Sequence, residues 1–243
     1  EKKADVGIGY DGDADRIGAI DERGEILWGD RLMIVYARDI LTQRPGTTFI
    51  SEVKASQCLY DDIAAKGGRP IMWKTGHSLM KAKLKAESAV LAGEMSGHMF
   101  FADRYFGFDD AIYASCRLVE ILAKTKQSLS TLVADLPQTT VTPEIRVDCP
   151  DTLKFQLVDQ VRTQLAAYLA EGKPVGASNL RMRELVTIDG VRAIFEDGWG
   201  LIRASNTQPA LVLRFEAPSP ARLDVIRATI ETELAQARRV LST

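Results

Sequence analysis

The chain has 243 residues, of which 46% are hydrophobic and 26% are charged, and its formal net charge is −2. This composition is ordinary for a globular protein, and the length suits two domains better than one. The near-neutral balance excludes the broad basic surface of a nucleic-acid-binding protein, and no apolar run is long enough to span a membrane.

The first predicted elements are short strands followed by a helix. Residues 4–9 and 17–20 have the small and apolar residues of buried strands, and Gly24 predicts a hairpin turn into a return strand. Asp30 can cap a helix over residues 31–43, because its carboxylate can accept hydrogen bonds from the first turn.

The next stretch alternates strands and helices regularly. The predicted strands are 47–53, 69–75 and 89–95, and the predicted helices are 56–67, 78–88 and 109–125. This order predicts an α/β domain with a mixed, mainly parallel sheet and helices on both faces. In the last helix, apolar or small residues recur at three- and four-residue steps as the expected buried stripe: Ile112, Ser115, Cys116, Val119 and Leu122.

A segment rich in Pro and Thr breaks the alternation, and residues 138–143 are predicted as a linker. An α+β C-terminal domain is expected after it. Its predicted elements are a strand at 144–149, a helix at 152–170, strands within 186–205 and 210–217, and a helix at 220–241. The predicted organisation is therefore a metal-binding segment at 1–29, an α/β domain at 30–137 and an α+β domain at 144–243.

Three scattered cysteines, Cys58, Cys116 and Cys149, form no CxxC pair. This pattern favours buried thiols in a reducing compartment over disulfides or a zinc site. Because no signal peptide is recognisable at the start, we expect a cytoplasmic protein.

Three aspartates alternate in the loop between the first two predicted strands: Asp11, Asp13 and Asp15. Alternating carboxylates suit a hard divalent cation, Mg²⁺ or Ca²⁺, and the following Arg16 can offset their surplus charge. An EF-hand is disfavoured because its sixth position requires Gly and is Arg16, although Glu22 falls at the twelfth. A polar turn with capping aspartates stays open as an alternative, but a compact metal loop is favoured.

The second candidate is His77, which follows Gly76 at a predicted strand-to-helix turn. Active-site loops of open α/β sheets lie at such turns. An ordinary surface or core histidine is the alternative, but the turn position and the flanking Lys74 and Lys81 favour a functional role.

The third candidate is the segment GEMSGH, residues 93–98. Its glycines, Gly93 and Gly97, allow close approach of a ligand to the backbone. Its polar side chains offer hydrogen-bond donors and acceptors. A serine hydrolase is disfavoured because the sequence lacks a GxSxG nucleophile elbow.

The fourth candidate is RASNTQP, residues 203–209. Arg203 can bind a phosphate with two hydrogen bonds, and Ser205, Asn206 and Thr207 add short donors. Taken alone, the segment fits an ordinary polar turn before Pro209 equally well.

Taken together and in this order, DGDADR, KTGHS, GEMSGH and RASNTQP resemble the motifs of the α-D-phosphohexomutase superfamily. The resemblance is closest to its bacterial phosphomannomutase/phosphoglucomutase branch, and FFADRYFGFDDAIYAS and VTPEIRV extend it over essentially the whole chain. It implies an intramolecular phosphotransferase, an isomerase of carbohydrate metabolism. Such an enzyme interconverts mannose or glucose 6-phosphate and 1-phosphate through a phosphoserine and a bisphosphorylated sugar. Mg²⁺ and hexose 1,6-bisphosphate are the implied cofactors, and a monomer or weak dimer is expected for the full-length enzyme.

The resemblance also implies a role for each matching residue. Asp11, Asp13 and Asp15 would bind Mg²⁺, and the catalytic residues would be Arg16, Lys54 and His77. The sugar would be bound by Glu94, Met95, Ser96, Gly97 and His98, and its phosphate by Arg203, Ser205, Asn206 and Thr207. Met95 is typical of mannose and glucose enzymes, whereas phosphoglucosamine mutases usually carry Gln there.

The family's phosphoserine lies in a Ser-His-Asn-containing loop of the first of four domains, and this sequence contains no Ser-His-Asn. We therefore expect a C-terminal portion that is inactive alone and binds Mg²⁺ weakly. A phosphoglucosamine mutase and a non-catalytic sugar-phosphate-binding module are the alternatives.

Overall fold

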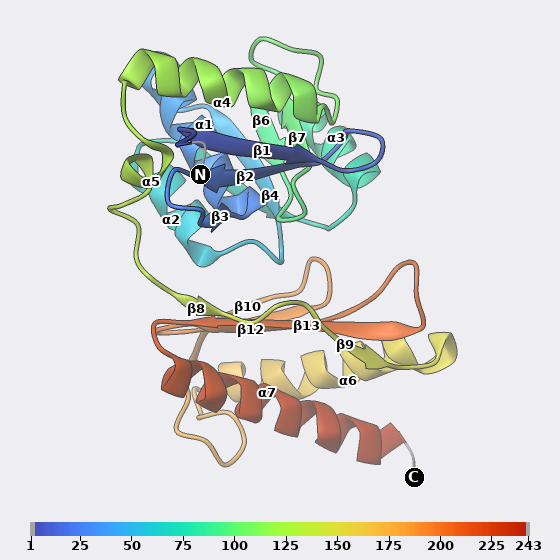
Figure 1. Ribbon diagram of the computed structural model, residues 1–243. Helices are drawn as coiled ribbons and strands as arrows, with labels where there is room; N and C mark the ends of the chain where they lie inside the picture. Colours follow the sequence, from blue (N-terminus) through green and yellow to red (C-terminus); the bar gives the residue numbers. More distant parts are fainter. Residues whose placement is uncertain (1–2, 242–243) are drawn as a thin grey trace. The chain divides into compact units, whose positions relative to one another are not determined.

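The computed structural model describes residues 3–241 (Figure 1). They form two compact units, one extending to Leu136 and the other beginning at Pro137. Each unit has a hydrophobic core of its own. Within the described residues, no helix combines the length and the apolar content that crossing a membrane requires.

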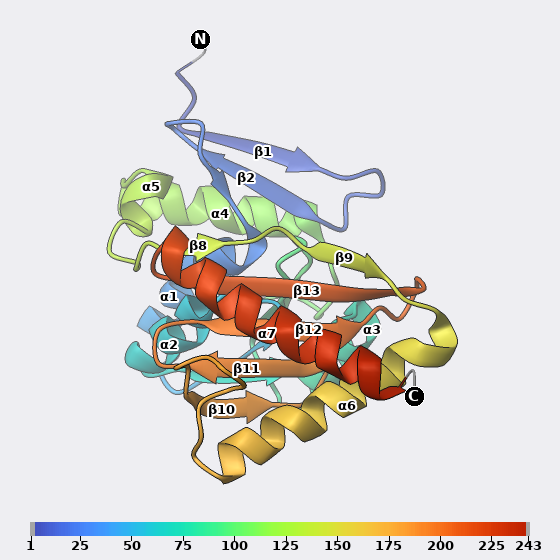
Figure 2. The ribbon, with the colours of Figure 1, turned by 90° about the horizontal axis from the view of Figure 1, so that it is seen from below.

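The first unit begins with a small antiparallel sheet in the order β1-β2-β3. Its strands are Val6–Tyr10, Ile17–Asp21 and Ile26–Leu27, which confirms the predicted hairpin. Gly24 makes the turn with a φ of 89°, a conformation that favours glycine. Ile17 and Ala19 belong to the core that this sheet shares with helix α4, Ala111–Thr125 (Figure 2).

A second sheet of four strands forms the centre of the first unit, in the order β5-β4-β6-β7. The strands are Thr48–Glu52 (β4), Arg69–Trp73 (β5), Leu91–Gly93 (β6) and Met99–Phe101 (β7). β4 pairs in parallel with β5 and β6, whereas β7 runs antiparallel to β6. The helices are Gly29–Gln43 (α1), Gln57–Ala65 (α2), His77–Ala86 (α3), Ala111–Thr125 (α4) and Leu129–Leu132 (α5).

Successive residues of the central strands contact opposite layers, as the two-residue period of a strand requires. Phe49 and Leu91 belong to the core with α1, α2 and α4, whereas Ile50 and Ala92 pack with Met80 of α3. The predicted mixed, mainly parallel sheet with helices on both faces is thereby confirmed.

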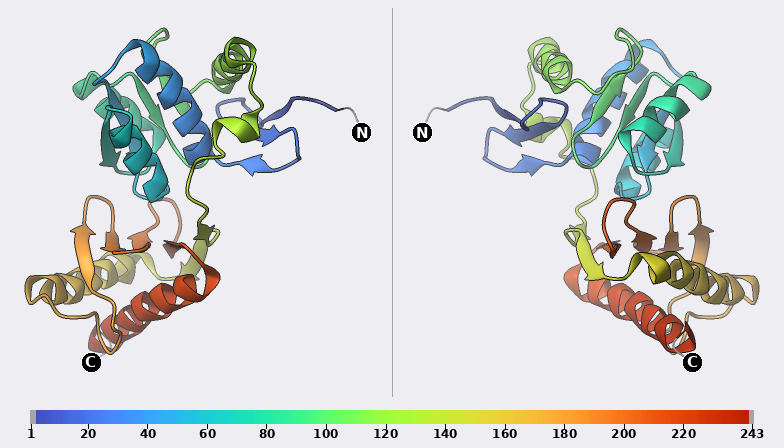
Figure 3. Two further views of the ribbon diagram at one scale, coloured as in Figure 1. Left: turned by 90° about the vertical axis from the view of Figure 1, so that its left-hand side faces the viewer. Right: turned by 90° about the vertical axis from the view of Figure 1, so that its right-hand side faces the viewer.

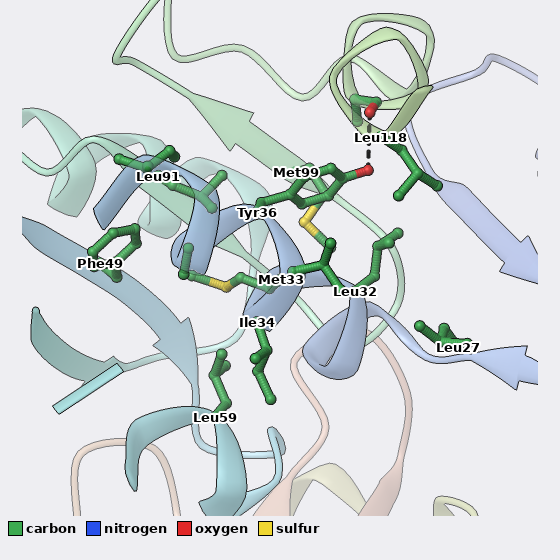
Figure 4. Packing of buried hydrophobic residues seen from close by; sticks show 14 of the residues in the cluster. Leu27, Leu32, Met33, Ile34, Tyr36, Phe49, Leu59, Leu91, Met99 and Leu118 are labelled. Carbon is green, nitrogen blue, oxygen red and sulfur yellow. Dashed lines mark hydrogen bonds between the residues drawn. The ribbon is translucent and has the colours of Figure 1, made fainter. Parts of the chain in front are cut away.

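Helix α1 is the centre of this core (Figure 4). Leu32, Met33, Ile34 and Tyr36 are fully buried, so the helix is buried over most of its surface. The Tyr36 hydroxyl donates a 2.9 Å hydrogen bond to the Ala114 carbonyl of α4, which satisfies its one buried polar group. Burial of each of the aliphatic side chains Leu32, Met33 and Ile34 stabilises the fold by roughly 1.5–3 kcal/mol.

The expected cap of α1 was wrong. The helix begins at Gly29, and Asp30 lies inside its first turn, where a negative charge is favourable. The Asp30 carboxylate accepts hydrogen bonds of 2.9 Å from the N–H groups of Arg31 and Ser56. Asp30 therefore joins the start of α1 to Ser56, the N-cap of α2.

The expected stripe of α4 was also largely wrong. Ile112 and Val119 are 57% and 50% exposed, and Cys116 is exposed too, whereas Cys58 and Cys149 are buried as predicted. Ser115 is buried as expected, together with Ala111, Ala114, Leu118 and Ile121. The small alanines allow close packing, and a pattern that counts large apolar residues overlooks them.

Arg117 also contributes to the difference between the predicted and the observed buried face of α4. Its side chain is only 4% exposed, its guanidinium donates to both carboxylate oxygens of Asp103 at 2.8 and 3.1 Å, and its Cζ lies 4.7 Å from the centre of the Phe101 ring. Because the charge is paired and lies against an aromatic face, an arginine occupies a position that the pattern assigns to the surface.

The second unit is an antiparallel sheet in the order β10-β11-β12-β13-β8, with β9 also paired to β13. Its strands are Thr140–Val141 (β8), Ile145–Asp148 (β9), Met182–Val186 (β10), Val191–Phe195 (β11), Trp199–Ala204 (β12) and Ala210–Ala217 (β13). Two long helices, Asp151–Ala170 (α6) and Pro220–Leu241 (α7), pack on one face (Figure 3). This confirms the predicted α+β domain.

The segment predicted as a linker, 138–143, is partly a strand. Thr140 and Val141 pair with Ala217 and Glu216 of β13. The Pro- and Thr-rich composition predicted a linker without secondary structure. Threonine and valine are β-branched and favour strands, which explains the pairing at these two positions.

Candidate functional site

The β1–β2 loop brings its three aspartates together. Asp11, Asp13 and Asp15 each offer a carboxylate oxygen, and these atoms lie within 4.8 Å of one another. Ala14, with a φ of 58°, bends the chain between them. The Asp15 Oδ1 atom is buried and accepts no hydrogen bond from the part of the chain that the structure describes. A buried carboxylate oxygen that accepts no hydrogen bond, within a set of hard oxygen donors, fits a divalent cation.

Arg16 is paired with this loop. Its Nε lies 2.5 Å from Asp11 Oδ2 and 3.5 Å from Asp15 Oδ1, and its backbone N–H donates to Asp11 Oδ1 at 3.2 Å. Desolvation favours the protonated form of Asp11, but the hydrogen bonds and charge of Arg16 outweigh it and lower the pKa of that carboxyl. The Asp11 carboxylate is therefore negatively charged at neutral pH.

The 94–98 loop connects β6 to β7 and is fixed against β2 by a glycine. The Ile17 N–H donates a 3.1 Å hydrogen bond to the Gly97 carbonyl. Gly97 has a φ of 101°, and a Cβ atom there would lie 2.4 Å from the Ile17 carbonyl oxygen. Since β2 follows the aspartate loop, this contact places the 94–98 loop beside the three carboxylates.

A second glycine fixes the other side of the same loop. The Gly29 N–H donates to the Met95 carbonyl at 3.3 Å. A Cβ at Gly29 would lie 2.3 Å from the Glu94 carbonyl oxygen. The start of α1 therefore packs directly on the 94–98 backbone, and only glycine allows this approach.

His98 connects the two loops through its ring nitrogens. Nε2 lies 3.2 Å from Asp15 Oδ2, and Nδ1 lies 2.9 Å from Glu94 Oε2 and 3.1 Å from Ser96 Oγ. Burial lowers the pKa of His98, but hydrogen bonding and charge attraction from Glu94 and Asp15 outweigh it, so the pKa is raised. The imidazole therefore tends to hold a proton between two carboxylates.

His77 lies at the edge of this cluster, at the first residue of α3. Its ring is 6.2 Å from that of His98, and its Nδ1 is 3.6 Å from Asp109 Oδ2. Asp109, which sequence reasoning missed, accepts a 3.0 Å hydrogen bond from Lys81 and forms with Asp15 and His98 a second group of possible metal ligands. Burial raises the pKa of Asp109, but the Lys81 ammonium outweighs it and lowers that pKa.

Lys54 is held by Glu52, a second residue that sequence reasoning missed. Glu52 is the last residue of β4 and is fully buried. Its Oε2 lies 3.4 Å from the Lys54 ammonium and accepts a 2.6 Å hydrogen bond from the Thr75 hydroxyl, while its Oε1 accepts one of 3.0 Å from the Met95 N–H. Its position at the carboxyl end of a parallel strand, two residues before Lys54, is the signal that could have identified it.

The pKa values of the buried carboxylates Glu52 and Glu94 shift in opposite directions. Burial raises the pKa of Glu52, and the charge of Glu94 adds to the effect. Burial acts on Glu94 in the same direction, but hydrogen bonds from His98 and from the Gly76 N–H, the latter at 2.7 Å, outweigh it and lower the pKa of Glu94. Glu94 is therefore the carboxylate that keeps its charge toward lower pH.

A groove with a volume of about 340 Å³ borders these loops. Its walls include Asp11 and Arg16 from the aspartate loop, Trp28 before α1, and Met95 and Ser96. The groove thus brings part of the aspartate loop together with Met95 and Ser96, and its volume suits a small ligand.

The second unit carries a separate cluster at the β12–β13 turn. Arg203 donates from Nε and Nη2 to the Asp189 carboxylate, at 3.1 and 3.3 Å. The Ser205 hydroxyl accepts from the N–H groups of Thr207 and Gln208, at 3.4 and 3.1 Å. Asp189 thus uses two of the five N–H donors of a guanidinium whose side chain is only 6% exposed.

Asn206 and Thr207 are exposed at the tip of this turn, and Lys154 of α6 supports it from below. The Lys154 ammonium donates to the carbonyls of Ser205 and Gln208 at 2.6 and 3.0 Å, and its Nζ lies 2.6 Å from Asp151 Oδ1. Sequence reasoning missed Lys154, because 51 residues separate it from Ser205. The turn is therefore rigid and presents short polar side chains outward.

Two family models match the chain in succession. The alpha/beta/alpha domain III of phosphoglucomutase/phosphomannomutase matches residues 28–140, and the C-terminal domain of the same family matches residues 144–233. Together they cover well over half of the chain.

Curated relatives and solved structures agree with this match. A Pseudomonas putida protein named phosphomannomutase/phosphoglucomutase is 47% identical over 234 residues, which is 96% of this chain and 48% of that protein. The chain thus spans about half the length of the curated relatives it matches.

An X-ray structure of a phosphoglucomutase/phosphomannomutase family protein from Burkholderia thailandensis has a TM-score of 0.84 and 43% identity over 97% of this chain and 47% of its own. The Aspergillus fumigatus N-acetylphosphoglucosamine mutase, solved in complex with GlcNAc-6P and magnesium, has a TM-score of 0.64 and 17% identity over 95% of this chain and 48% of its own. At that identity the second likeness shows the fold alone.

Proposed function

Because this chain belongs to the phosphoglucomutase/phosphomannomutase family, we propose that it supplies the metal, sugar and phosphate sites of a phosphohexomutase. The whole protein would interconvert mannose or glucose 6-phosphate and 1-phosphate through a phosphoserine and a bisphosphorylated sugar. The observation that carries the proposal is the contact between His98 and Asp15. It joins the 94–98 loop, called the sugar loop below, to the β1–β2 loop with its three aspartates, called the aspartate loop. The substrate is a phosphosugar, and we propose a cytoplasmic location.

In this proposal, the aspartate loop holds the metal. Asp11, Asp13 and Asp15 would hold Mg²⁺, which stabilises the charge that develops on a phosphoryl group during transfer. Arg16 lies against the same carboxylates, so its guanidinium can offset their charge and contact the phosphoryl oxygens. Lys54, whose position Glu52 fixes, adds a second cation to the site.

The 94–98 loop would recognise the hexose. Glu94 and Ser96 offer a carboxylate and a hydroxyl for sugar hydroxyl groups, and the fixed backbone of Met95 and Gly97 sets their positions. His98 can hold a proton at a ring nitrogen between Glu94 and Asp15, next to where phosphoryl transfer would take place. His77 stands at the entrance of the cluster and contacts substrate in this proposal.

The β12–β13 turn would bind the phosphate that does not react. Arg203, Ser205, Asn206 and Thr207 provide its donors. Holding that phosphate fixes the orientation of the sugar, which converts much of the binding energy into correct alignment. The bisphosphorylated sugar must present either of its two phosphates to the metal site. The β12–β13 turn would therefore bind the other phosphate in both orientations of the ligand.

The test is ligand binding by the 243-residue chain. In the presence of Mg²⁺, glucose 1-phosphate and mannose 1-phosphate should shift the backbone amide resonances of the 94–98 and 205–207 segments in an NMR titration. Glucosamine 1-phosphate should bind more weakly if Met95 marks a mannose or glucose enzyme. Shifts confined to one segment, or equal affinity for sulfate, would contradict the proposal.

A further inference from the structure

The carboxylate of Glu52 lies where three loops of the first unit meet. These loops follow the parallel strands β4, β5 and β6 at their carboxyl ends, and they carry Lys54, Thr75 and Met95 respectively. Each of the three donates a proton toward the same carboxylate or lies within ion-pair distance of it, at 3.4, 2.6 and 3.0 Å.

We propose that Glu52 is a positioning residue for sugar-phosphate binding, which holds the cation of Lys54, the turn before His77 and the sugar loop in one fixed arrangement. The inference rests on the proposed function for the identity of the ligand. The geometry of the three loops stands independently of it.

Burial makes these contacts strong. Glu52 is fully buried, and a carboxylate removed from water is costly unless donors surround it. Its partners are an ammonium, a hydroxyl and a backbone N–H, which replace the water that burial removes. The same contacts that stabilise the carboxylate therefore restrict the loops.

Glu94 ties the same loops a second time. It belongs to the sugar loop and accepts a 2.7 Å hydrogen bond from the Gly76 N–H, next to Thr75. The Thr75–Glu52–Met95 and Gly76–Glu94 connections thus join the 75–77 turn and the 94–98 loop at two places, and the first also reaches Lys54.

The substitution Glu52→Gln tests the inference, because it keeps the shape of the side chain and removes its charge. A carboxamide has one acceptor oxygen, so it cannot serve Met95, Thr75 and Lys54 together. We expect glucose 1-phosphate to bind about tenfold more weakly in the presence of Mg²⁺. The amide resonances of Met95 and Gly76 should shift in the ligand-free protein. Thr75→Val, which removes one of the three contacts, should give a smaller change in the same direction.

Thr48→Val is the matched control. Thr48 lies at the opposite end of β4 and accepts a 3.0 Å hydrogen bond from Arg69 Nε, so the variant also loses a hydrogen bond from this strand. It should bind glucose 1-phosphate within about twofold of the wild type. Wild-type affinity in Glu52→Gln with unchanged resonances at Met95 and Gly76 would overturn the inference, and so would an equal loss in Thr48→Val.

The two proposals can fail separately. If the wild-type chain binds no glucose 1-phosphate, the proposed function of this chain fails, while the resonances of the ligand-free variants still decide whether Glu52 holds the loops. If Glu52→Gln does not fold, the Thr75→Val variant decides the question through the same two measurements.

Discussion

Substitution of Gly97 by alanine should separate the sugar loop from the aspartate loop. Gly97 has a φ of 101°, and an added Cβ would lie 2.4 Å from the Ile17 carbonyl oxygen, which is backbone and cannot rotate away. The loop must therefore move, and the 3.1 Å hydrogen bond from the Ile17 N–H to the Gly97 carbonyl is lost.

Two contributions set the expected magnitude. An L-residue with positive φ costs roughly 1–2 kcal/mol. Loss of the hydrogen bond adds about 1 kcal/mol. We therefore expect Gly97→Ala to destabilise the local structure by about 2–3 kcal/mol. A cost of about 2 kcal/mol raises the equilibrium constant for local opening of this contact about 30-fold.

Hydrogen exchange at the Ile17 amide measures this directly, because that N–H is the donor of the lost bond. Gly24→Ala is the matched control. Its φ is 89° but no atom lies within 4 Å of the added Cβ, so it reports the backbone cost alone. Equal effects of the two substitutions, or unchanged exchange at Ile17 in Gly97→Ala, would refute the reasoning.

Other predictions concern separate parts of the molecule. The pKa of Glu22 lies at about 2, below its ordinary 4.5, mainly because the Ser130 hydroxyl donates to it. This stabilisation is complete above about pH 4.5 and is lost as the pH falls through about 2; an NMR titration of Ser130→Ala should find the pKa moved toward 4.5, and an unmoved value would contradict the assignment. Lys154→Met should destabilise the second unit by about 2 kcal/mol in urea denaturation, with partial recovery in Lys154→Arg. Asp13→Asn should weaken Mg²⁺ binding about tenfold by calorimetry, starting from a weak wild-type affinity. The 243-residue chain should not convert mannose 1-phosphate, so detectable mannose 6-phosphate would contradict the expected need for a phosphoserine.

The strands and helices that sequence patterns predicted are those with local signals. The turn glycine Gly24 and the N-cap serine Ser56 mark their element ends directly, and the alternation of strands with helices specifies the sheet. Strand β7, Met99–Phe101, was not predicted, because three apolar residues carry no periodicity and the strand exists through its pairing with β6. Most of β10 escaped prediction too, since Met182–Val186 alternates weakly and contains two charged residues.

The candidate site divides in the same way. The residues of short motifs were identified because their neighbours in sequence are their neighbours in space, as in the aspartate loop. Glu52, Asp109 and Lys154 were missed because their partners lie in other elements. Long-range hydrogen bonds of this kind leave no local pattern, and a buried charged residue looks like a surface one until its partners are known.

The way in which the sugar loop is fixed has a consequence for how its selectivity can change. Glu52 contacts Met95 through the backbone N–H, and Gly29 contacts it through the backbone carbonyl. Neither contact depends on which side chain position 95 carries. Under the proposed function, a mutation there would alter which hexose is accepted, while the backbone contacts that position the loop would stay intact. Under the proposed function, exchanges of the side chain at position 95 on an unchanged backbone would change the sugar preference in single mutational steps.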